Sequence, residues 1–424
     1  MASAQKYSLI SLGCSKNLVD SEVFCAITER AGYSYTQNLG EANLIFVNTC
    51  GFIDDAKKEA VDTIFEVLEY KKSGACNKVI VTGCFVHRYF EEIKKDIPEI
   101  DHLVDLKNFS DFAKIVGVEA TSERKILTLP HTVYLRIADG CDNLCSYCTI
   151  PFIRGEQKSE PIEFLVDEAQ KLVSNGVKEI TLTAQDTTNY GVDIYGKASL
   201  PKLLVQLAKI EKLRWIRVLY LHPDHLTNQI IETIQALPKV CNYFEMPIQH
   251  ISTRVLKLMN REKDKHQIER IIQKIRQNNS TIRTTLMCGF PSETEADFKQ
   301  LYEFVKRVKF DRLGVFAYSP QEDTPAYRLN SQVSKAVAET RRQKLMDVQK
   351  NISQKKLKGF VGRIIEVIVD TKVSKEVGSY IGRSRFDAPD IDGVVYLKGE
   401  WQVGEITKCL VVDSTDYDLY GVKP

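Results

Sequence analysis

Three cysteines stand within eight residues of this chain, at positions 141, 145 and 148 of the segment CDNLCSYC. This spacing confines them to one compact loop, so three neighbouring thiolates favour a shared metal centre. A structural zinc needs four ligands, and the flanking sequence offers no obvious fourth Cys or His. A [4Fe–4S] cluster on Cys141, Cys145 and Cys148, here named the loop trio, leaves one iron open to a small molecule. Three cysteines without a metal are the alternative.

The loop trio follows the first of six apolar segments that alternate with helical ones. Helices such as 161–176 and 293–308 separate the expected strands, which are 132–138, 178–184, 214–220, 243–248, 282–289 and 312–318. This pattern predicts a βα barrel, complete or partial, whose chemistry lies at the carboxyl ends of its strands. The loop trio occupies such a position. A charged helix over 334–359 leads out of the barrel.

The first 120 residues show another alternation of strands and helices. Three strands are expected at 6–13, 42–49 and 77–83, with helices between them, which predicts a doubly wound parallel sheet. Cys14, Cys50 and Cys84, here named the sheet trio, each end one of these strands beside a glycine that permits a tight turn. Neighbouring parallel strands share their carboxyl edge. We therefore predict a second metal site there, and coincidence among three core cysteines is the alternative.

The pattern changes again from Phe360 onward. Short alternating strands joined by Gly, Asp and Pro turns favour a small antiparallel β-barrel of the five-stranded kind. The predicted fold class is therefore α/β with three domains. Residues 1–120 carry the sheet trio, residues 127–357 form the βα barrel, and residues 358–424 form the small β-barrel.

The overall composition adds constraints on location. The net charge of +2 gives no strong field toward nucleic acid or a membrane surface. The sequence has neither a signal-peptide pattern nor an apolar run of about 18 residues, so we expect a cytoplasmic protein without a membrane partner. Eleven cysteines in such a chain favour metal ligation over disulfides. The isolated ones are expected to be small buried residues: Cys25, Cys76, Cys241, Cys288 and Cys409.

Several longer motifs carry a resemblance to a known family. CDNLCSYC followed by TIPFIRG is similar to the radical S-adenosylmethionine superfamily, in its methylthiotransferase branch. Five other segments resemble the same branch: SLGCSKNLVDSE, VNTCGFIDDAKKEA, AQDTTNYG, MPIQHISTRVLKLMNR and TTLMCGFPSETEADF. The tail IGRSRFDAPDIDGVVYL resembles the TRAM domain of the subgroup that modifies a ribosomal protein. The resemblance spans essentially the whole chain, with departures at Ser15, Glu160, Cys288 and Ser292 that remove no predicted ligand.

The resemblance implies an enzyme with two [4Fe–4S] clusters, one on each trio, and with S-adenosylmethionine at the loop trio. The sheet trio is then the sulfur carrier. The implied reaction transfers a methylthio group to the β carbon of an aspartyl residue in a small-subunit ribosomal protein. A flavodoxin-like or ferredoxin-like electron donor is the other implied partner. No acid–base dyad is needed, so no catalytic residue is assigned beyond the cluster ligands.

A few residues near these motifs keep two interpretations. Tyr147 either contacts the cluster or the nucleoside, or it only packs. The segment LMCGFPSET either lies along the nucleoside or forms a tight turn. His222, His225 and His250 are expected to be polar packing residues, without an assigned role.

Two alternative functions remain at this point. A similar branch methylthiolates an adenosine in transfer RNA. Residues 358–424 hold nine Lys and Arg against eleven Asp and Glu, a balance of −2, which suits a basic protein better than RNA phosphates. Together with the tail 381–397, this argues against a direct transfer-RNA substrate. The other alternative is an iron–sulfur scaffold or electron carrier, which would need no barrel of this size.

Overall fold

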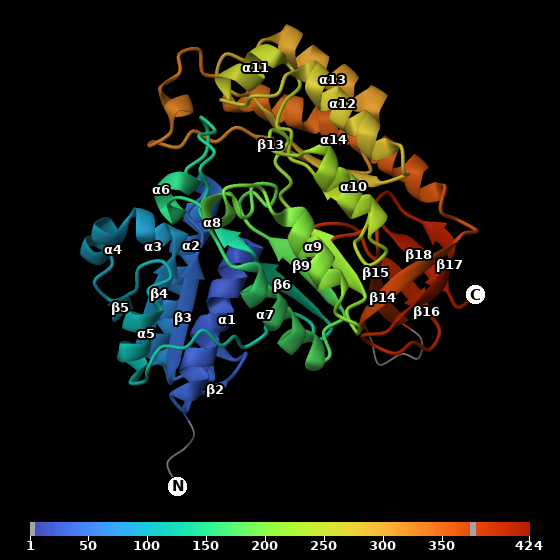
Figure 1. Ribbon diagram of the computed structural model, residues 1–424. Coiled ribbons are helices and arrows are strands. Elements are labelled where there is room, and N and C mark those ends of the chain that lie inside the picture. The colour runs from blue at the N-terminus through green and yellow to red at the C-terminus, as the bar shows by residue number, and fades with distance from the viewer. Residues whose placement is uncertain (1–4, 374–378) are drawn as a thin grey trace.

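The computed structural model describes residues 5–373 and 379–424, and three regions follow one another along the chain (Figure 1). The N-terminal region is a five-stranded parallel sheet in the order β2-β1-β3-β4-β5. Its strands are β1 (Lys6–Ser11), β2 (Ser34–Tyr35), β3 (Leu44–Thr49), β4 (Lys78–Gly83) and β5 (His102–Leu103). Its helices are α1 (Ser15–Arg30), α2 (Asp54–Ser73), α3 (Cys84–Arg88), α4 (Phe90–Asp96) and α5 (Phe109–Val116).

Helices cover both faces of this sheet. The central strand β3 is buried along its whole length, as expected for a parallel strand between two helical layers. Ile45 and Val47 pack in a core with α2, whereas Leu44 and Phe46 pack in a second core with α1 and α5. The predicted doubly wound parallel sheet is confirmed.

The central region is a partial βα barrel of six parallel strands. They form two three-stranded sheets, β10-β9-β6 and β11-β12-β13, which are joined where Leu221 N donates to Glu245 O at 2.9 Å. The strands are β6 (Thr132–Arg136), β9 (Glu179–Thr183), β10 (Trp215–Val218), β11 (Tyr243–Glu245), β12 (Thr281–Cys288) and β13 (Arg312–Ala317). All six expected strands are present. A short pair, β7 (Ala138–Asp139) and β8 (Lys158–Ser159), lies beside β6 in the chain.

Helices connect the barrel strands and continue beyond the last one. They are α6 (Ile150–Arg154), α7 (Ile162–Ser174), α8 (Val192–Tyr195), α9 (Leu200–Ala208), α10 (Asn228–Ala236), α11 (Thr253–Leu258), α12 (Lys265–Arg276), α13 (Glu295–Val308) and α14 (Lys335–Lys358). The helix α14 matches the charged segment expected to leave the barrel. Within the described residues, no helix has both the length and the apolar character needed to cross a bilayer.

The C-terminal region is a closed five-stranded barrel in the order β14-β15-β16-β18-β17. Its strands are β14 (Ile364–Lys372), β15 (Ser379–Ser384), β16 (Val395–Lys398), β17 (Ile406–Ser414) and β18 (Leu419–Val422). It differs from the expected antiparallel barrel in one pair, because β16 and β18 run parallel. The barrel lies beside the central region, on the side away from the N-terminal sheet (Figure 1).

The loop between β15 and β16 joins this small barrel to the central one. Residues 384–393, here named the docking loop, bury Ala388 completely in a cluster with Trp215 and Tyr243 of the central strands. Asp392 accepts from Tyr243 Oη at 2.6 Å and pairs with Arg283 at 2.5 Å. Tyr243 is the first residue of β11, so the docking loop lies at the amino ends of the strands. It is therefore remote from the carboxyl ends, where chemistry is expected.

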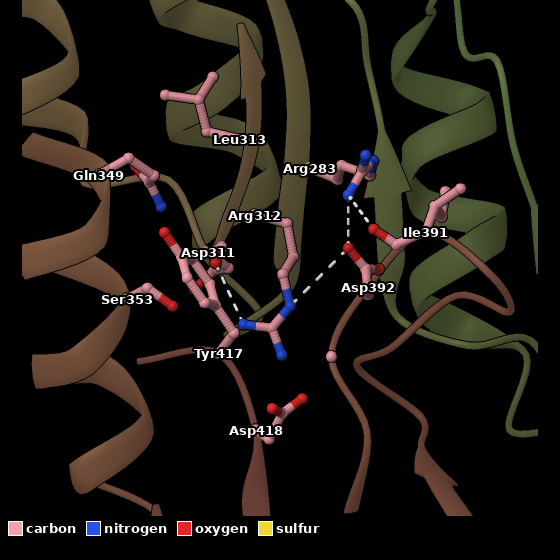
Figure 2. Close-up of a pocket in the computed structure, with 11 residues that line it drawn as sticks. Arg283, Asp311, Arg312, Leu313, Gln349, Ser353, Ile391, Asp392, Tyr417 and Asp418 are labelled. Atoms are coloured by element: carbon pink, nitrogen blue, oxygen red, sulfur yellow. Dashed lines mark hydrogen bonds and ion pairs between the residues drawn. The ribbon is translucent and has the colours of Figure 1, made fainter. Parts of the chain in front are cut away.

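A cavity of about 300 Å³ lies beside the docking loop, between β13, α14 and the C-terminal barrel. Figure 2 shows Arg283 and Arg312 both directed at Asp392 on its wall. Arg312 also pairs with Asp387, so the two arginines are balanced by two carboxylates. The cavity belongs to the joint between the two barrels and contains none of the predicted site residues.

Candidate metal centres

The loop trio lies between β7 and α6, beyond the carboxyl end of β6. Pairing of β7 with β8 closes the base of this loop, and Cys141 N donates to Gly155 O at 3.0 Å. Ser146 N donates to Met259 O at 3.0 Å, which ties the loop to the end of α11. Gly140 has a φ of 77°, and a Cβ there would collide with Glu156 O. The backbone before Cys141 therefore requires glycine, and the loop is held at both ends.

The three cysteines of the sheet trio lie along one edge of the N-terminal sheet. Cys14 precedes α1, Cys50 follows β3 directly, and Cys84 is the first residue of α3. The strands β1, β3 and β4 are neighbours in parallel register, so their carboxyl ends lie side by side. The structure thus brings together three cysteines that are far apart in the sequence, as the strand-end argument predicted.

Glycines make room for the sheet trio. A Cβ on Gly13 would lie 3.2 Å from Cys50 Sγ, and a Cβ on Gly51 would lie 2.7 Å from Phe85 Cα. Gly83 has a φ of 102°, and a Cβ there would collide with the backbone of Thr49. Larger residues at these positions would therefore displace the cysteines or the strands that carry them.

The two trios differ in electrostatic surroundings. Burial opposes ionisation of Cys14, but the charges of Lys16 and Arg154 outweigh it and hold the pKa of that thiol below its ordinary value. Burial raises the pKa of Cys84 to about 12, although Arg154 opposes the rise. In the loop trio, burial raises the pKa of Cys141 to about 11 and that of Cys148 to about 12. Burial also raises the pKa of Cys50, so the cationic environment favours thiolate at Cys14 but not at Cys50 or Cys84.

Arg154, at the end of α6, connects the two trios. Its side chain is only 1% exposed. One guanidinium nitrogen donates to both carboxylate oxygens of Asp139 at 3.1 Å, close before the loop trio. The other nitrogen donates to Asn17 Oδ1 at 2.6 Å and to Asp20 Oδ2 at 3.1 Å, and it lies 3.7 Å from Cys84 Sγ. The central and N-terminal regions are thus joined by a buried, charge-assisted network.

Asp186 and two histidines lie beside the loop trio. His222 Nε2 is 3.9 Å from Cys145 Sγ, and His225 Nδ1 is 2.7 Å from Asp186 Oδ2. Asn143, inside the cysteine loop, donates to the same carboxylate at 2.9 Å. Burial lowers the pKa of His222 to about 3, so it is neutral. His222 and His225 were expected only as packing residues, and the structure places them at the cysteine loop instead.

Spacing distinguishes these polar groups from the cysteines. In the part of the chain that the structure describes, one set of three potential ligand atoms lies within 4.8 Å of one another. These atoms belong to Asp186, His222 and His225. The sulfur atoms of both trios are more widely spaced. A single zinc ion with Zn–S bonds of about 2.3 Å would need closer sulfurs.

The remaining candidate residues are placed as follows. Tyr147 Oη accepts from Arg261 at 2.6 Å, and its ring meets Phe290 edge-on. It therefore packs between the loop trio and the turn after β12. His250 is fully buried, and its Nδ1 accepts from Ser252 N, which fits polar packing. The five isolated cysteines are buried, as predicted.

Comparison with known proteins gives the family. The chain is 45% identical to ribosomal protein uS12 methylthiotransferase RimO of Clostridioides difficile, over 98% of both chains. It is 43% identical to the protein of the same name from Petrotoga mobilis, over 98% of this chain and 99% of that one. The chain belongs to this methylthiotransferase family. The predicted resemblance is thereby confirmed, and the protein is a radical S-adenosylmethionine enzyme.

Three matches divide the methylthiotransferase chain. Residues 6–105 match the uncharacterized protein family UPF0004, residues 135–305 the Radical SAM superfamily, and residues 361–423 the TRAM domain. Among solved structures, the radical S-adenosylmethionine methyltransferase TsrM from Kitasatospora setae, with cobalamin and a [4Fe-4S] cluster bound, is similar with a TM-score of 0.56. That similarity covers 77% of each chain at 13% identity and concerns the fold.

Several acidic residues of the C-terminal region are internal. The balance of −2 over residues 358–424 favours a basic protein partner only if those acids lie on the surface. Asp370 binds Arg383 and His131, and Asp387 and Asp392 bind arginines of the central barrel. Two further charges in the count, Lys375 and Glu376, lie outside the described residues. The acids of the TRAM tail therefore hold the domains together and give no measure of partner charge.

Proposed function

We propose that this methylthiotransferase adds a methylthio group to the β carbon of an aspartyl residue in the small-subunit ribosomal protein uS12. The observation that carries the proposal is the presence of two separate cysteine trios, each at the carboxyl ends of parallel strands. The names of relatives similar along the whole chain support uS12 as the substrate. A ribosomal substrate also implies that the reaction takes place in the cytoplasm.

We propose that Cys141, Cys145 and Cys148 hold one [4Fe–4S] cluster and that the sheet trio holds another. Three sulfurs too widely spaced for one ion fit a cluster, because each cysteine then binds a different iron. Three ligands also leave one iron of each cube open. When bound, the first cluster supplies the electron that cleaves S-adenosylmethionine to a radical, and the second supplies a site for the sulfur that is transferred.

The surrounding side chains have complementary tasks in this proposal. Asp186 stays ionised beside the loop trio, because hydrogen bonds and nearby histidines hold its pKa near 2 despite burial. It offers an acceptor to the amino group of S-adenosylmethionine. Tyr147 lies beside the loop trio, and its ring packs edge-on against Phe290. A flavodoxin-like or ferredoxin-like protein would deliver the electrons.

The decisive experiment offers the anaerobically reconstituted enzyme both candidate substrates, uS12 and unmodified transfer RNA, with S-adenosylmethionine and a reductant. We expect a mass increase of about 46 Da on the protein, the replacement of one hydrogen by a methylthio group. An increase on the RNA alone would show that the substrate is wrong. Formation of 5′-deoxyadenosine excludes a mere scaffold or electron carrier.

The boundaries 1–120, 127–357 and 358–424 are part of the same proposal. Limited proteolysis should cut between these units before it cuts within them. The docking loop predicts that the cut near residue 358 is the slower one, because residues 384–393 hold the small barrel onto the central strands.

A further inference from the structure

A buried lysine lies beside the sheet trio without a carboxylate partner. Lys16 is the second residue of α1 and follows Cys14 by two positions. It is 7% exposed, and its Nζ lies 3.5 Å from the centre of the Tyr220 ring. Among the residues that the structure describes, its Nζ donates no hydrogen bond and has no carboxylate oxygen within 4.0 Å. Besides the Tyr220 ring, its charge acts on the nearby Cys14 sulfur, which is a proposed cluster ligand. A buried ammonium without a hydrogen-bonded anion is expensive, so a further anionic partner is implied.

The arginines beside the sheet trio are already paired with carboxylates. Arg154 binds Asp20 and Asp139, and Arg136 binds Asp20. Arg261 donates to Tyr147 Oη at 2.6 Å. Among the described residues, Lys16 therefore differs from Arg136 and Arg154 in having no carboxylate partner.

Lys16 also lies where the two regions meet. The preceding residue, Ser15, is within hydrogen-bond distance of Thr183, the last residue of β9, at 3.1 Å. Tyr220, under the ammonium, follows the carboxyl end of β10. The lysine thus reaches from the edge that carries the sheet trio to the barrel end that carries the loop trio. A substrate residue that loses a hydrogen at the loop trio and receives a methylthio group from the sheet trio has to lie between the two trios.

Glu245 is a carboxylate of the central barrel that interacts electrostatically with Lys16. It lies beyond ion-pair distance, and its Oε2 accepts the backbone amide of Tyr220. Burial raises the pKa of Glu245, which weakens it further as a counter-ion. The internal carboxylate therefore leaves the ammonium available.

We propose that Lys16 binds the side-chain carboxylate of the substrate aspartyl residue and so fixes its β carbon between the two trios. The inference rests on the proposed function and adds the residue that recognises the substrate side chain. A charge-assisted hydrogen bond to a carboxylate is strong in a site from which water is excluded. An adenine base is neutral and offers Lys16 no counter-charge, so the same contact favours an aspartate side chain over an adenine base.

The test measures binding by the holoenzyme, without reductant, to two forms of uS12. One form carries Asp at the modified position, which mass spectrometry of the wild-type product locates, and the other carries Asn. We compare the wild type with Lys16→Met, Lys16→Arg and Lys78→Met. Lys78, at the amino end of β4, is half-buried and donates to Ile115 O, so it is a matched control away from the trios.

The wild type should bind the Asp form about 10- to 100-fold more tightly than the Asn form, the range for a hydrogen bond to a charged group. Lys16→Met should bind both forms equally, and Lys16→Arg should keep part of the preference. Lys78→Met should match the wild type. Each variant is measured with both forms of uS12. The ratio of its two affinities is therefore unaffected by any general change in the protein.

Iron content is measured first, and variants are compared at equal occupancy. If Lys16→Met fails to retain iron, Lys16→Gln replaces it, because the amide keeps a polar group at the end of the side chain. A preference for Asp that survives removal of the charge would overturn the role of Lys16, as would a wild type that modifies uS12 but binds both forms equally. A wild type that ignores uS12 and modifies only RNA would instead overturn the proposed function.

Discussion

The two cysteine trios reach similar positions by different routes. The loop trio is contained in eight residues, and its geometry is set by one loop pinned at its base and at α11. The sheet trio is spread over seventy residues, and only the register of β1, β3 and β4 brings it together. One site depends on local spacing and the other on the packing of a whole sheet. The second should therefore be the more sensitive to changes in the fold around it.

The trios also differ in charge, and this difference suits separate tasks. Lys16 and Arg154 place positive charge at the sheet trio, whereas Asp186 adds negative charge near Cys141. A cationic setting stabilises an anionic sulfur species, and an acidic one favours a cationic substrate such as S-adenosylmethionine. Arg154 keeps the two sites in a fixed relation, because it is bonded to residues beside each.

The largest expected effect comes from removing each trio separately. Replacing Cys141, Cys145 and Cys148 by Ala should lower the iron content from about eight to about four per chain, as should replacing Cys14, Cys50 and Cys84. Both variants should lose methylthio transfer. Only the first should also lose cleavage of S-adenosylmethionine, which chromatography of 5′-deoxyadenosine measures. Equal loss of cleavage in a well-folded sheet-trio variant would remove the proposed division of tasks.

A matched pair of glycines tests whether the sheet trio is the more sensitive to packing. Gly83 and Gly155 have similar backbone angles, with φ of 102° and 73° and ψ of −169° and −163°. Alanine at either costs about 1–3 kcal/mol of strain. Only at Gly83 does a Cβ collide with neighbouring backbone, which adds about 1–3 kcal/mol.

Urea unfolding and iron content check this expectation. Gly83→Ala should lose most of the iron of the sheet trio, whereas Gly155→Ala should keep the iron of the loop trio. Equal losses in the two variants would show that backbone conformation, and not crowding, governs both sites.

A smaller effect is expected from weakening the docking loop. Asp392→Asn keeps an acceptor for Tyr243 but removes the charge that Arg283 faces, so it should cost about 2 kcal/mol of stability in the central barrel. The loop trio belongs to that barrel and the sheet trio to a separate core. In increasing urea, the loop trio should therefore lose its cluster absorbance before the sheet trio. Simultaneous loss would mean that Arg154 couples the two regions into one unfolding unit.

Much of this architecture could be predicted from the sequence because it depends on local patterns of apolar and polar residues. The six barrel strands are short apolar runs between amphipathic helices, and each is found where it was expected. The loop trio needs no tertiary information. Even the sheet trio was predictable, because parallel strands that alternate with helices must share one edge for their carboxyl ends.

Residues that act across domain boundaries could not be predicted in the same way. Arg154 ends a five-residue helix, and no pattern in TIPFIRG indicates that it binds Asp20 and Asp139 while approaching Cys84. His222 lies 3.9 Å from Cys145 only because β10 ends beside the cysteine loop. The charge count of the C-terminal region failed for the same reason, since composition does not distinguish a buried ion pair from an exposed carboxylate.

The smallest predicted effect concerns the iron-free protein and compares Cys14 with Cys148, both partly exposed. Lys16 and Arg154 hold the pKa of Cys14 below its ordinary value, so its thiolate forms at lower pH than that of a free cysteine. Burial raises the pKa of Cys148 to about 12, which leaves about a thousandfold less thiolate at neutral pH than an ordinary cysteine has. Because the thiolate is the reactive form, iodoacetamide at pH 7 should label Cys14 first, and Cys148 should follow only as the pH approaches 12.

Peptide mass spectrometry over a pH series gives both profiles, and circular dichroism verifies that the iron-free chain stays folded. Lys16→Met should shift the Cys14 profile to higher pH and leave that of Cys148 unchanged. Coinciding profiles in the wild type would show that the charge difference between the two trios does not reach their sulfur atoms.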